Sequence, residues 1–508
     1  MCQLLEIPEL VNLVLGQMSR PDQARFLQAS RSAFYLAVPF VWHSLQTAEG
    51  EVIELPDSLD DLNIARLRFY AAFVKKVILH RATNRIHDLP TKARYRTRLE
   101  NFLNWQSLFD YSDRQVLLPK LVTIEYRDFS HSVVLNWLRV LLSSSVRSLN
   151  ITNPAPQLLP DILSLLAFKS PSLAELTVLP KDLTGSHGDP PLFNQPQFTE
   201  RFSDFQELQT LECTLAIFHP QALLMLGALP HLRRIIVDVG GAPSLTYDSD
   251  LPDICFPSLQ ELCIERMAPA WATSLCFLKP VLKPLSSVSV SVLPHWSDNA
   301  VLGEHWMDLL LLCLSENAPY LSRLSVLTVT DGPSVVPALV SLDAQEAMSR
   351  LSLKTLSLDN AHFGDGTGCA FLSSAWLGIE ELRCGLQKCN PSELALFARN
   401  LPHLKELQLD TDMSGSNIPY NATQISSDSP RSTAFRRLTG STPTIYQRSP
   451  EQTITLARYL HALWPNICCT FAEDESFGTM GIFSYERDAH RQLQCLNTCI
   501  AQVQAESS

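Results

Sequence analysis

The sequence predicts an α/β fold in which a short strand and a helix repeat many times along the chain. The first observation is an apolar phrase of the form L-x-x-L-x-L, found in LPHLRRIIV (229–237) and again in LPHLKELQL (401–409). The second is that relaxed copies, with Val, Ile or a similar small apolar residue in place of Leu, recur throughout the chain. These copies begin at Val74, Leu121, Val146, Leu173, Leu208, Leu232, Leu259, Leu285, Leu321, Leu353, Ile379 and Leu404.

The spacing of the phrase indicates a stacked repeat. From Leu121 onward the steps are 25, 27, 35, 24, 27, 26, 36, 32, 26 and 25 residues, and most are close to the period of about 20–29 residues seen in one class of solenoid. The final L-x-L of each copy alternates as a strand does, so both apolar side chains point to one face. We therefore expect about a dozen parallel strands within residues 74–410.

Segments between the phrases have helical spacing. Examples are HPQALLMLGALP (219–230) and NPSELALFARNLP (390–402), which begin near proline; Asn390 or Ser392 could cap the second helix. One strand with one helix cannot bury its apolar face, whereas stacked copies can. The alternative is an ordinary α/β domain in which the phrases coincide by chance.

The chain before Val74 predicts three short helices in residues 1–48 and a linker or helix in 49–73. A helical stripe is formed by Ile7, Leu10, Val11, Val14, Leu15 and Met18. Pro21 and Asp22 open a second helix, and a third runs towards Pro39, followed by Trp42. So small a module has more large apolar side chains than its own core can hide. We expect the surplus to meet a partner or the first repeats.

After the last phrase the composition changes. Residues 411–450 are rich in Ser, Thr and Pro and predict a polar loop. Residues 451–508 predict a helical cap: a helix at 451–465, a strand in NICCTF, and a final helix at 485–504. The apolar positions Leu493, Leu496, Ile500 and Val503 suit docking of that helix on the last repeat. The basic stretch at 80–98 is expected to be a solvated insertion.

Bulk composition excludes several classes. A net charge of -12 and a pI of about 5.6 argue against a nucleic-acid partner, which favours a basic footprint. The apolar run from Leu309 to Leu314 is far shorter than the roughly 20 residues that span a bilayer, so no membrane partner is expected. Thirteen cysteines without CxxC spacing, and acidic residues where a signal peptide would be basic, predict reduced thiols in the cytoplasm, the nucleus or both.

Catalytic and metal motifs are weak. The sequence has no P-loop, GxGxxG, HExxH or GxSxG, so we expect no catalytic residues, cofactor or metal. His295 and His305 lie near acidic residues, but a metal site there is a poor hypothesis. Cys384 and Cys389 are five residues apart, and burial in the core explains them better.

The residues that alternate with the apolar positions of the phrase should share the other face of the sheet. We expect seven of the charged ones to contact a protein substrate: Glu175, Glu212, Arg234, Glu261, Arg323, Arg383 and Glu406. Six Glu and three Arg occupy this predicted face from residue 123 to 408, which weakly favours a basic partner segment. The alternative is a solvated sheet surface with binding elsewhere.

Two resemblances extend these expectations. Residues 70–410 resemble the leucine-rich-repeat family in period and phrase, although the Asn or Cys that usually follows the phrase is missing. Residues 7–45 resemble an F-box, through Pro8, the stripe to Met18, Asp22, ASR (29–31), and Pro39 with Trp42. FYLAVPFVWHSL is similar to fungal F-box proteins in particular. Gln23 and Ala24 depart from the family, where Leu commonly follows the Asp.

The resemblance implies an irregular leucine-rich-repeat solenoid, with parallel strands on its concave face and helices on its convex face, behind a three-helix F-box. F-boxes dock on the Skp adaptor of cullin–RING ubiquitin ligases, and the repeats hold a substrate. The residues implied to face the adaptor are Ile7, Pro8, Leu10, Val14, Leu15, Leu27 and Trp42. The expected protein is a non-catalytic substrate receptor; the alternative is a ligase-independent binding scaffold whose N-terminal helices only cap the repeats.

Overall fold

Strands and helices alternate along the chain, as the phrase predicts. The computed structural model describes residues 8–28, 33, 37, 43–46, 68–80, 105–127, 133–152, 158–179, 200–239, 256–269, 271–293, 305–328, 338–364, 366–411, 435–440, 449–471 and 483–507. The chain divides into two units. Unit 1 comprises Met1–Asp238 with Ile254–Ser258, and unit 2 comprises Val239–Asp253 with Leu259–Ser508.

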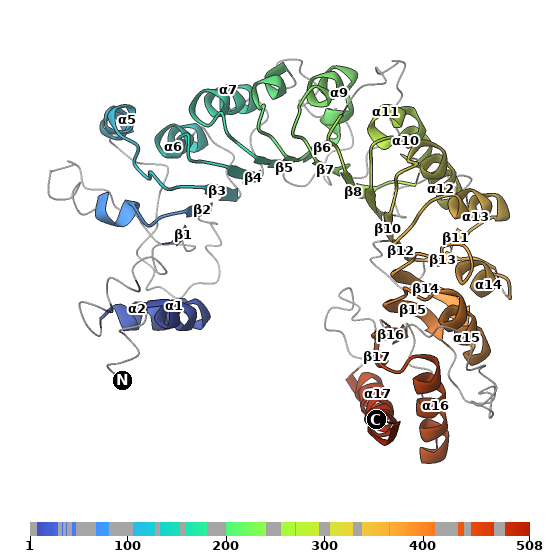
Figure 1. Cartoon of the computed structure of the whole chain (residues 1–508). Helices are drawn as coiled ribbons and strands as arrows, with labels where there is room; N and C mark the ends of the chain where they lie inside the picture. Colours follow the sequence, from blue (N-terminus) through green and yellow to red (C-terminus); the bar gives the residue numbers. More distant parts are fainter. Residues whose placement is uncertain are drawn as a thin grey trace. The chain divides into compact units, whose positions relative to one another are not determined.

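Unit 1 begins with helices and continues as a parallel sheet whose strand order follows the chain (Figure 1). Its strands are β1 (Ser44–Gln46), β2 (Lys76–His80), β3 (Thr123–Arg127), β4 (Ser148–Thr152), β5 (Glu175–Leu179), β6 (Thr210–Thr214) and β7 (Arg234–Asp238). Its helices are α1 (Pro8–Gln17), α2 (Arg20–Leu27), α5 (Trp105–Arg114), α6 (Val133–Leu141), α7 (Leu159–Lys169) and α9 (Pro220–Gly227), with 3-10 turns η6 (Glu200–Asp204) and η7 (Leu215–Phe218). Helices α5 to α9 all lie on one side of the strands.

Unit 2 repeats this arrangement, again with parallel pairing in chain order (Figure 1). Its main strands are β8 (Glu261–Met267), β9 (Ser287–Val292), β10 (Arg323–Thr328), β12 (Thr355–Leu358), β14 (Glu381–Cys389), β15 (Glu406–Thr411), β16 (Arg437–Gly440) and β17 (Cys468–Phe471). Two short strands, β11 (Ala338–Leu339) and β13 (Ala361–His362), form a separate pair.

Helices of unit 2 connect most of these strands. They are α10 (Trp271–Leu275), η8 (Cys276–Leu278), α11 (Lys279–Leu282), α12 (Trp306–Asn317), α13 (Leu342–Ser349), α14 (Gly368–Leu372), α15 (Pro391–Asn400), α16 (Pro450–Leu463) and α17 (Phe483–Ser507). Among the described residues no helix combines the length and the apolar character needed to cross a membrane.

The apolar phrase forms the core because its side chains stack from strand to strand. In unit 1 the register aligns Ile124, Leu149, Leu176, Leu211 and Ile235, and all of them are buried. Strand β4 alternates strictly between buried and half-buried residues, so one face packs against the helices. The predicted α/β class and large parallel sheet are therefore confirmed, and the stacking is compatible with a solenoid.

Helix starts follow the capping rules read from the sequence. Of the two candidate caps for α15, Asn390 is the one used: its side chain accepts the backbone N–H of Glu393, at 3.0 Å. The Glu393 carboxylate accepts the N–H of Asn390 in return, at 2.7 Å, which completes a capping box. Ser449 and Gln452 form the same arrangement at the start of α16.

Two buried glutamine amides form hydrogen bonds with the loop backbone on either side of β12. Gln345 donates to the carbonyls of Val340 and Phe363, at 2.9 and 3.3 Å. Gln387 accepts the N–H of Phe363 at 2.9 Å. Gly368 leaves room for this amide, since a Cβ there would lie 2.6 Å from Gln387 Oε1. These glutamines satisfy loop backbone that would otherwise be buried without partners.

Two strands were not expected from the sequence. Strand β1 lies within residues 1–48, after the three expected helices, and pairs in parallel with β2. Strand β16 lies within 411–450, the range expected to be a loop, and pairs with β15 and β17. Of the expected third helix, only Ala33 and Ala37 are described; both are helical and buried.

Candidate protein-binding surfaces

Helices α1 and α2 meet at a short polar junction. Ser19 caps α2 by accepting the N–H of Asp22 at 3.4 Å, and Asp22 pairs with Arg25 at 3.0 Å. The amide of Gln23 donates to the carbonyls of Leu15 and Met18, at 2.7 and 3.2 Å. These carbonyls belong to the end of α1 and the turn after it, so Gln23 links the second helix to the first. Its polar side chain therefore has a structural role at a position where the F-box pattern has leucine.

The apolar residues of α1 divide between two environments. Leu15 is 1% exposed, whereas Leu13 and Val14 are 66% and 52% exposed. Leu15 is therefore covered by its own chain, and its expected role as an adaptor contact stays a prediction. Val14 is accessible as expected, and its neighbour Leu13 was missed because it does not belong to the helical stripe.

The other adaptor-facing predictions have no described side-chain environment. Pro8 and Leu10 belong to α1 and Leu27 ends α2, but their side chains are not among those described. Ile7 and Trp42 lie outside the described residues altogether.

The second candidate surface is the face of each sheet that carries the residues alternating with the core positions; we call it the strand face. In unit 1 it contains Glu175, Glu212 and Arg234. Glu175 and Arg234 are exposed, at the first position of their strands. Glu212 is half-buried and accepts a hydrogen bond from Thr177 on the neighbouring strand, at 2.9 Å.

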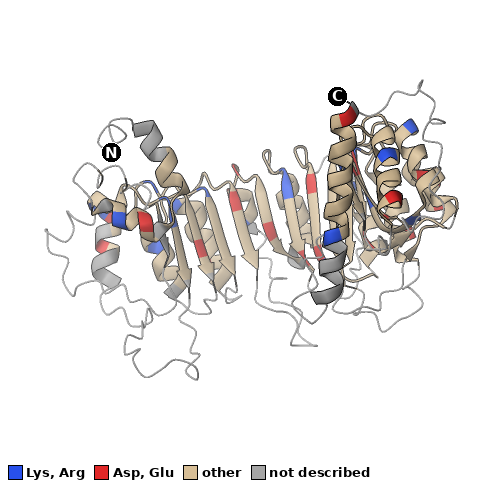
Figure 2. Cartoon of the chain, turned by 90° about the horizontal axis from the view of Figure 1, so that it is seen from below, with Lys and Arg blue, Asp and Glu red and all other residues tan. Residues whose placement is uncertain are grey.

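In unit 2 the strand face contains Glu261, Arg323, Arg383 and Glu406. Arg383 donates to Glu406 at 2.9 Å and lies 3.8 Å from Glu381, so these three charges form one cluster. Arg323 is exposed, and its register partners Ser287 and Thr355 are uncharged. Figure 2 shows basic and acidic positions interspersed with uncharged ones along the strands.

Sequence reasoning missed two basic members of this face. Lys76, on β2, forms an ion pair with Glu125. Arg437 lies in register with Glu406, on the strand that was expected to be a loop. Beside the face, a hydrogen bond from Lys405 lowers the pKa of the Glu380 carboxyl. The face is thus more balanced in charge than the sequence count indicated, because several acids already have basic neighbours.

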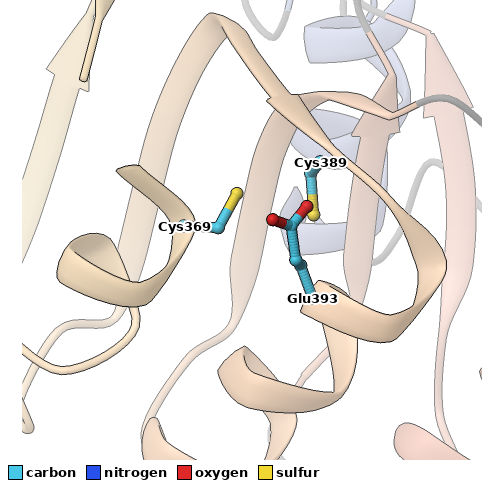
Figure 3. Close-up of side chains that lie close together, drawn as sticks. All are labelled: Cys369, Cys389 and Glu393. Carbon is cyan, nitrogen blue, oxygen red and sulfur yellow. The ribbon is translucent and has the colours of Figure 1, made fainter. Parts of the chain in front are cut away.

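A cluster of metal-ligating residues lies apart from these surfaces. Cys369 is in α14, Cys389 ends β14, and Glu393 is in the first turn of α15 (Figure 3). One potential ligand atom from each lies within 4.8 Å of the others. The expected burial of Cys384 and Cys389 is confirmed, but the pairing of Cys389 with Cys369 was not predicted.

No protein-family model matches this chain, and no curated protein matches it.

Proposed function

We propose that this chain is a non-catalytic substrate receptor of a Skp–cullin–F-box ubiquitin ligase. In this proposal the N-terminal helices are an F-box that binds the Skp-type adaptor. The strand and helix units are leucine-rich repeats whose strand face holds a protein substrate. Ubiquitin transfer is then carried out by the partner subunits.

The observation that carries the proposal is the exposure of Leu13 and Val14 on α1. Burying a Leu or Val side chain contributes about 1.5–3 kcal/mol, so a partner that covered both would gain substantially. Ser19, Asp22 and Arg25 supply polar groups close by along the chain. An apolar centre beside polar groups is typical of a protein–protein interface. The F-box-like pattern of residues 7–45 then identifies the kind of partner.

For the substrate, the strand face favours a segment with charges of both signs. Exposed Glu175 and Arg323 are better placed for contact than Arg383 and Glu406, whose mutual ion pair a substrate would have to replace. Polar and charged groups at such a surface contribute more to specificity than to affinity.

Co-purification with a Skp adaptor tests the proposal. The double variant Leu13→Asp/Val14→Asp places two charges on the exposed part of α1, and we expect it to lose adaptor binding by at least about tenfold. Phe168→Asp is the matched control, because Phe168 is 82% exposed on α7 and outside the expected F-box. A wild-type chain that does not bind the adaptor, or a double variant that binds it equally well, contradicts the proposal.

The design of the truncation follows from the structure. Deleting residues 1–48 would remove β1 and leave β2 as a new sheet edge, so loss of binding could reflect damage to the sheet. Deleting residues 1–28 keeps β1 and is the better variant. We expect the truncated chain to lose adaptor binding while the unfolding temperature of the sheet stays unchanged.

A ligase-independent binding scaffold is the second candidate. It is favoured by the burial of Leu15, because this side chain of α1 is already covered by the chain itself. A chain that captures a protein partner through its strand face while ignoring the adaptor would support this candidate.

A further inference from the structure

The cysteine cluster of unit 2 lies where three elements meet. Cys369 comes from the first turns of α14, Cys389 is the last residue of β14, and Glu393 follows within the first turn of α15 (Figure 3). Both cysteines are buried free thiols, and Glu393 is half-buried. Ligand atoms within 4.8 Å of one another need only a small closure, since donors around a tetrahedral Zn²⁺ lie about 3.5–4 Å apart.

The thiols of Cys369 and Cys389 can lose their protons without leaving the Lys388 carbonyl unbonded. Cys369 Sγ donates to the carbonyl of Lys388 at 3.2 Å, but the Gln387 amide also donates to that oxygen, at 3.2 Å. Cys389 Sγ makes a long contact, 3.5 Å, with the carbonyl of Asn390, and a hydrogen bond with the Cys369 thiol. Replacing both protons by a cation would therefore leave the Lys388 carbonyl with a hydrogen bond.

Only one carboxylate oxygen of Glu393 is used by the capping box. Glu393 Oε2 accepts the N–H of Asn390 in the capping box. Its Oε1 has no hydrogen bond within the part of the chain that the structure describes. One oxygen can therefore keep the cap while the other binds a cation. Glu393 itself is partly exposed.

We propose that Cys369, Cys389 and Glu393 bind one divalent cation of the zinc class, with water in the fourth position. Two thiols lose their protons to solvent, and two thiolates with one carboxylate then hold the ion. Soft sulfur ligands select zinc over magnesium or calcium. The N-terminus of α15 lies beside Cys389 and favours the negative charge that develops there. The bound ion would fasten α14 and α15 to the end of β14.

The hydrogen bond with Cys369, together with burial, raises the pKa of the Cys389 thiol above its usual range. Because cysteine binds zinc as the thiolate, cation binding should release protons. This proposal is independent of the adaptor and substrate surfaces.

Cobalt titration of the purified full-length chain under reducing conditions tests the site. We expect a thiolate-to-cobalt absorption band that saturates at one equivalent and is displaced by zinc. Cys369→Ser and Cys389→Ser should abolish the band. Cys213→Ser, which changes a buried thiol of unit 1, should leave it unchanged.

Glu393→Gln separates ligation from folding. Glutamine also serves at this position of a capping box, so α15 should keep its start. We expect cobalt affinity to fall by more than the roughly 10–100-fold that follows loss of an outer-shell partner. An absent band in the wild type, an unchanged band in either cysteine variant, or unchanged affinity in Glu393→Gln would overturn the proposal.

Discussion

The two ends of the described chain both add helices to a parallel sheet, but they treat their apolar side chains differently. In unit 2, α17 buries Leu493, Leu496 and Ile500. In unit 1, α1 buries Leu15 and leaves Leu13 and Val14 exposed. A helix that buries its apolar face on its own chain acts as a cap, whereas the exposed apolar residues of α1 are available to a partner.

The C-terminal helix also covers the backbone of β17. Asn497 accepts the N–H of Cys469 at 3.0 Å and donates to the carbonyl of the same residue at 2.8 Å. An uncovered strand edge would offer these groups to other chains. Trp464 directly follows α16 in the sequence. It is fully buried and stacks on Phe435, with ring centroids 4.1 Å apart. The C-terminal helices are therefore part of the core of unit 2.

The largest effect should come from Trp464→Ala. Removing a fully buried, stacked ring costs about 3–5 kcal/mol in the free energy of unfolding. Urea unfolding with hydrogen exchange of β16 and β17 would measure it. Trp464→Phe is the control: it keeps a ring for Phe435 and removes an indole N–H that has no partner among the described residues. A small cost for Trp464→Ala would show that the C-terminal region is loosely attached.

A matched pair of leucines compares the two ends directly. Leu496 is 2% exposed and Leu13 is 66% exposed. We expect Leu496→Ala to cost about 2–5 kcal/mol, and Leu13→Ala to change the stability of the isolated chain by less than about 0.5 kcal/mol. Thermal unfolding of both variants gives the comparison. Similar costs would mean that Leu13 packs within the chain, which would remove the support for a binding surface on α1.

Asn497→Ala should have a smaller effect. The variant leaves the N–H and C=O of Cys469 without their side-chain partner, at a cost of about 1–3 kcal/mol. We also expect more self-association, because part of an edge strand becomes available. Sedimentation at increasing protein concentration would detect it. If both stability and association are unchanged, the amide does not protect the edge.

Thiol labelling should show the smallest effect, but it reports directly on two neighbouring residues of β17. Cys468 is exposed and Cys469 is buried, and burial raises the pKa of Cys469 to about 12. Only the thiolate reacts, so at pH 8 iodoacetamide should label Cys468 well before Cys469. Deleting residues 483–508 should bring the labelling rates of the two closer together. Equal rates in the intact chain would contradict the covering role of α17.

The sheet could be predicted from the sequence because buried and more exposed residues alternate along the strands. Leu149 and Ile151 are buried where the phrase places them, and Ser148 and Asn150 lie on the strand face. Sequence reasoning missed β16 because FRRLTG has the large Phe435 at its first position and Gly440 at its last, where the phrase has small apolar residues. It missed β1 for the same reason, since Trp42 stands three residues before Leu45.

The candidate sites were less predictable than the sheet. A helical stripe shows that α1 has an apolar side but not which residues its own chain covers, so Leu15 was assigned to a partner. Cys369 and Cys389 are 20 residues apart, and their proximity depends on how α14 packs against β14. The register shift between Cys384 and Lys388, where β14 pairs with β15, is a further irregularity that no spacing rule contains.

Strand order that follows the chain has a consequence for how the protein is made. Most neighbouring strands are separated by one strand-and-helix unit, commonly 25–36 residues, so each new strand can join one that has already left the ribosome. At about 5–20 residues per second, one unit emerges roughly every one to seven seconds. The growing edge stays open while strands are added, and α17 follows β17 and covers it. A ribosome that stalls before residue 483 would therefore release a chain with β17 uncovered and ready to aggregate.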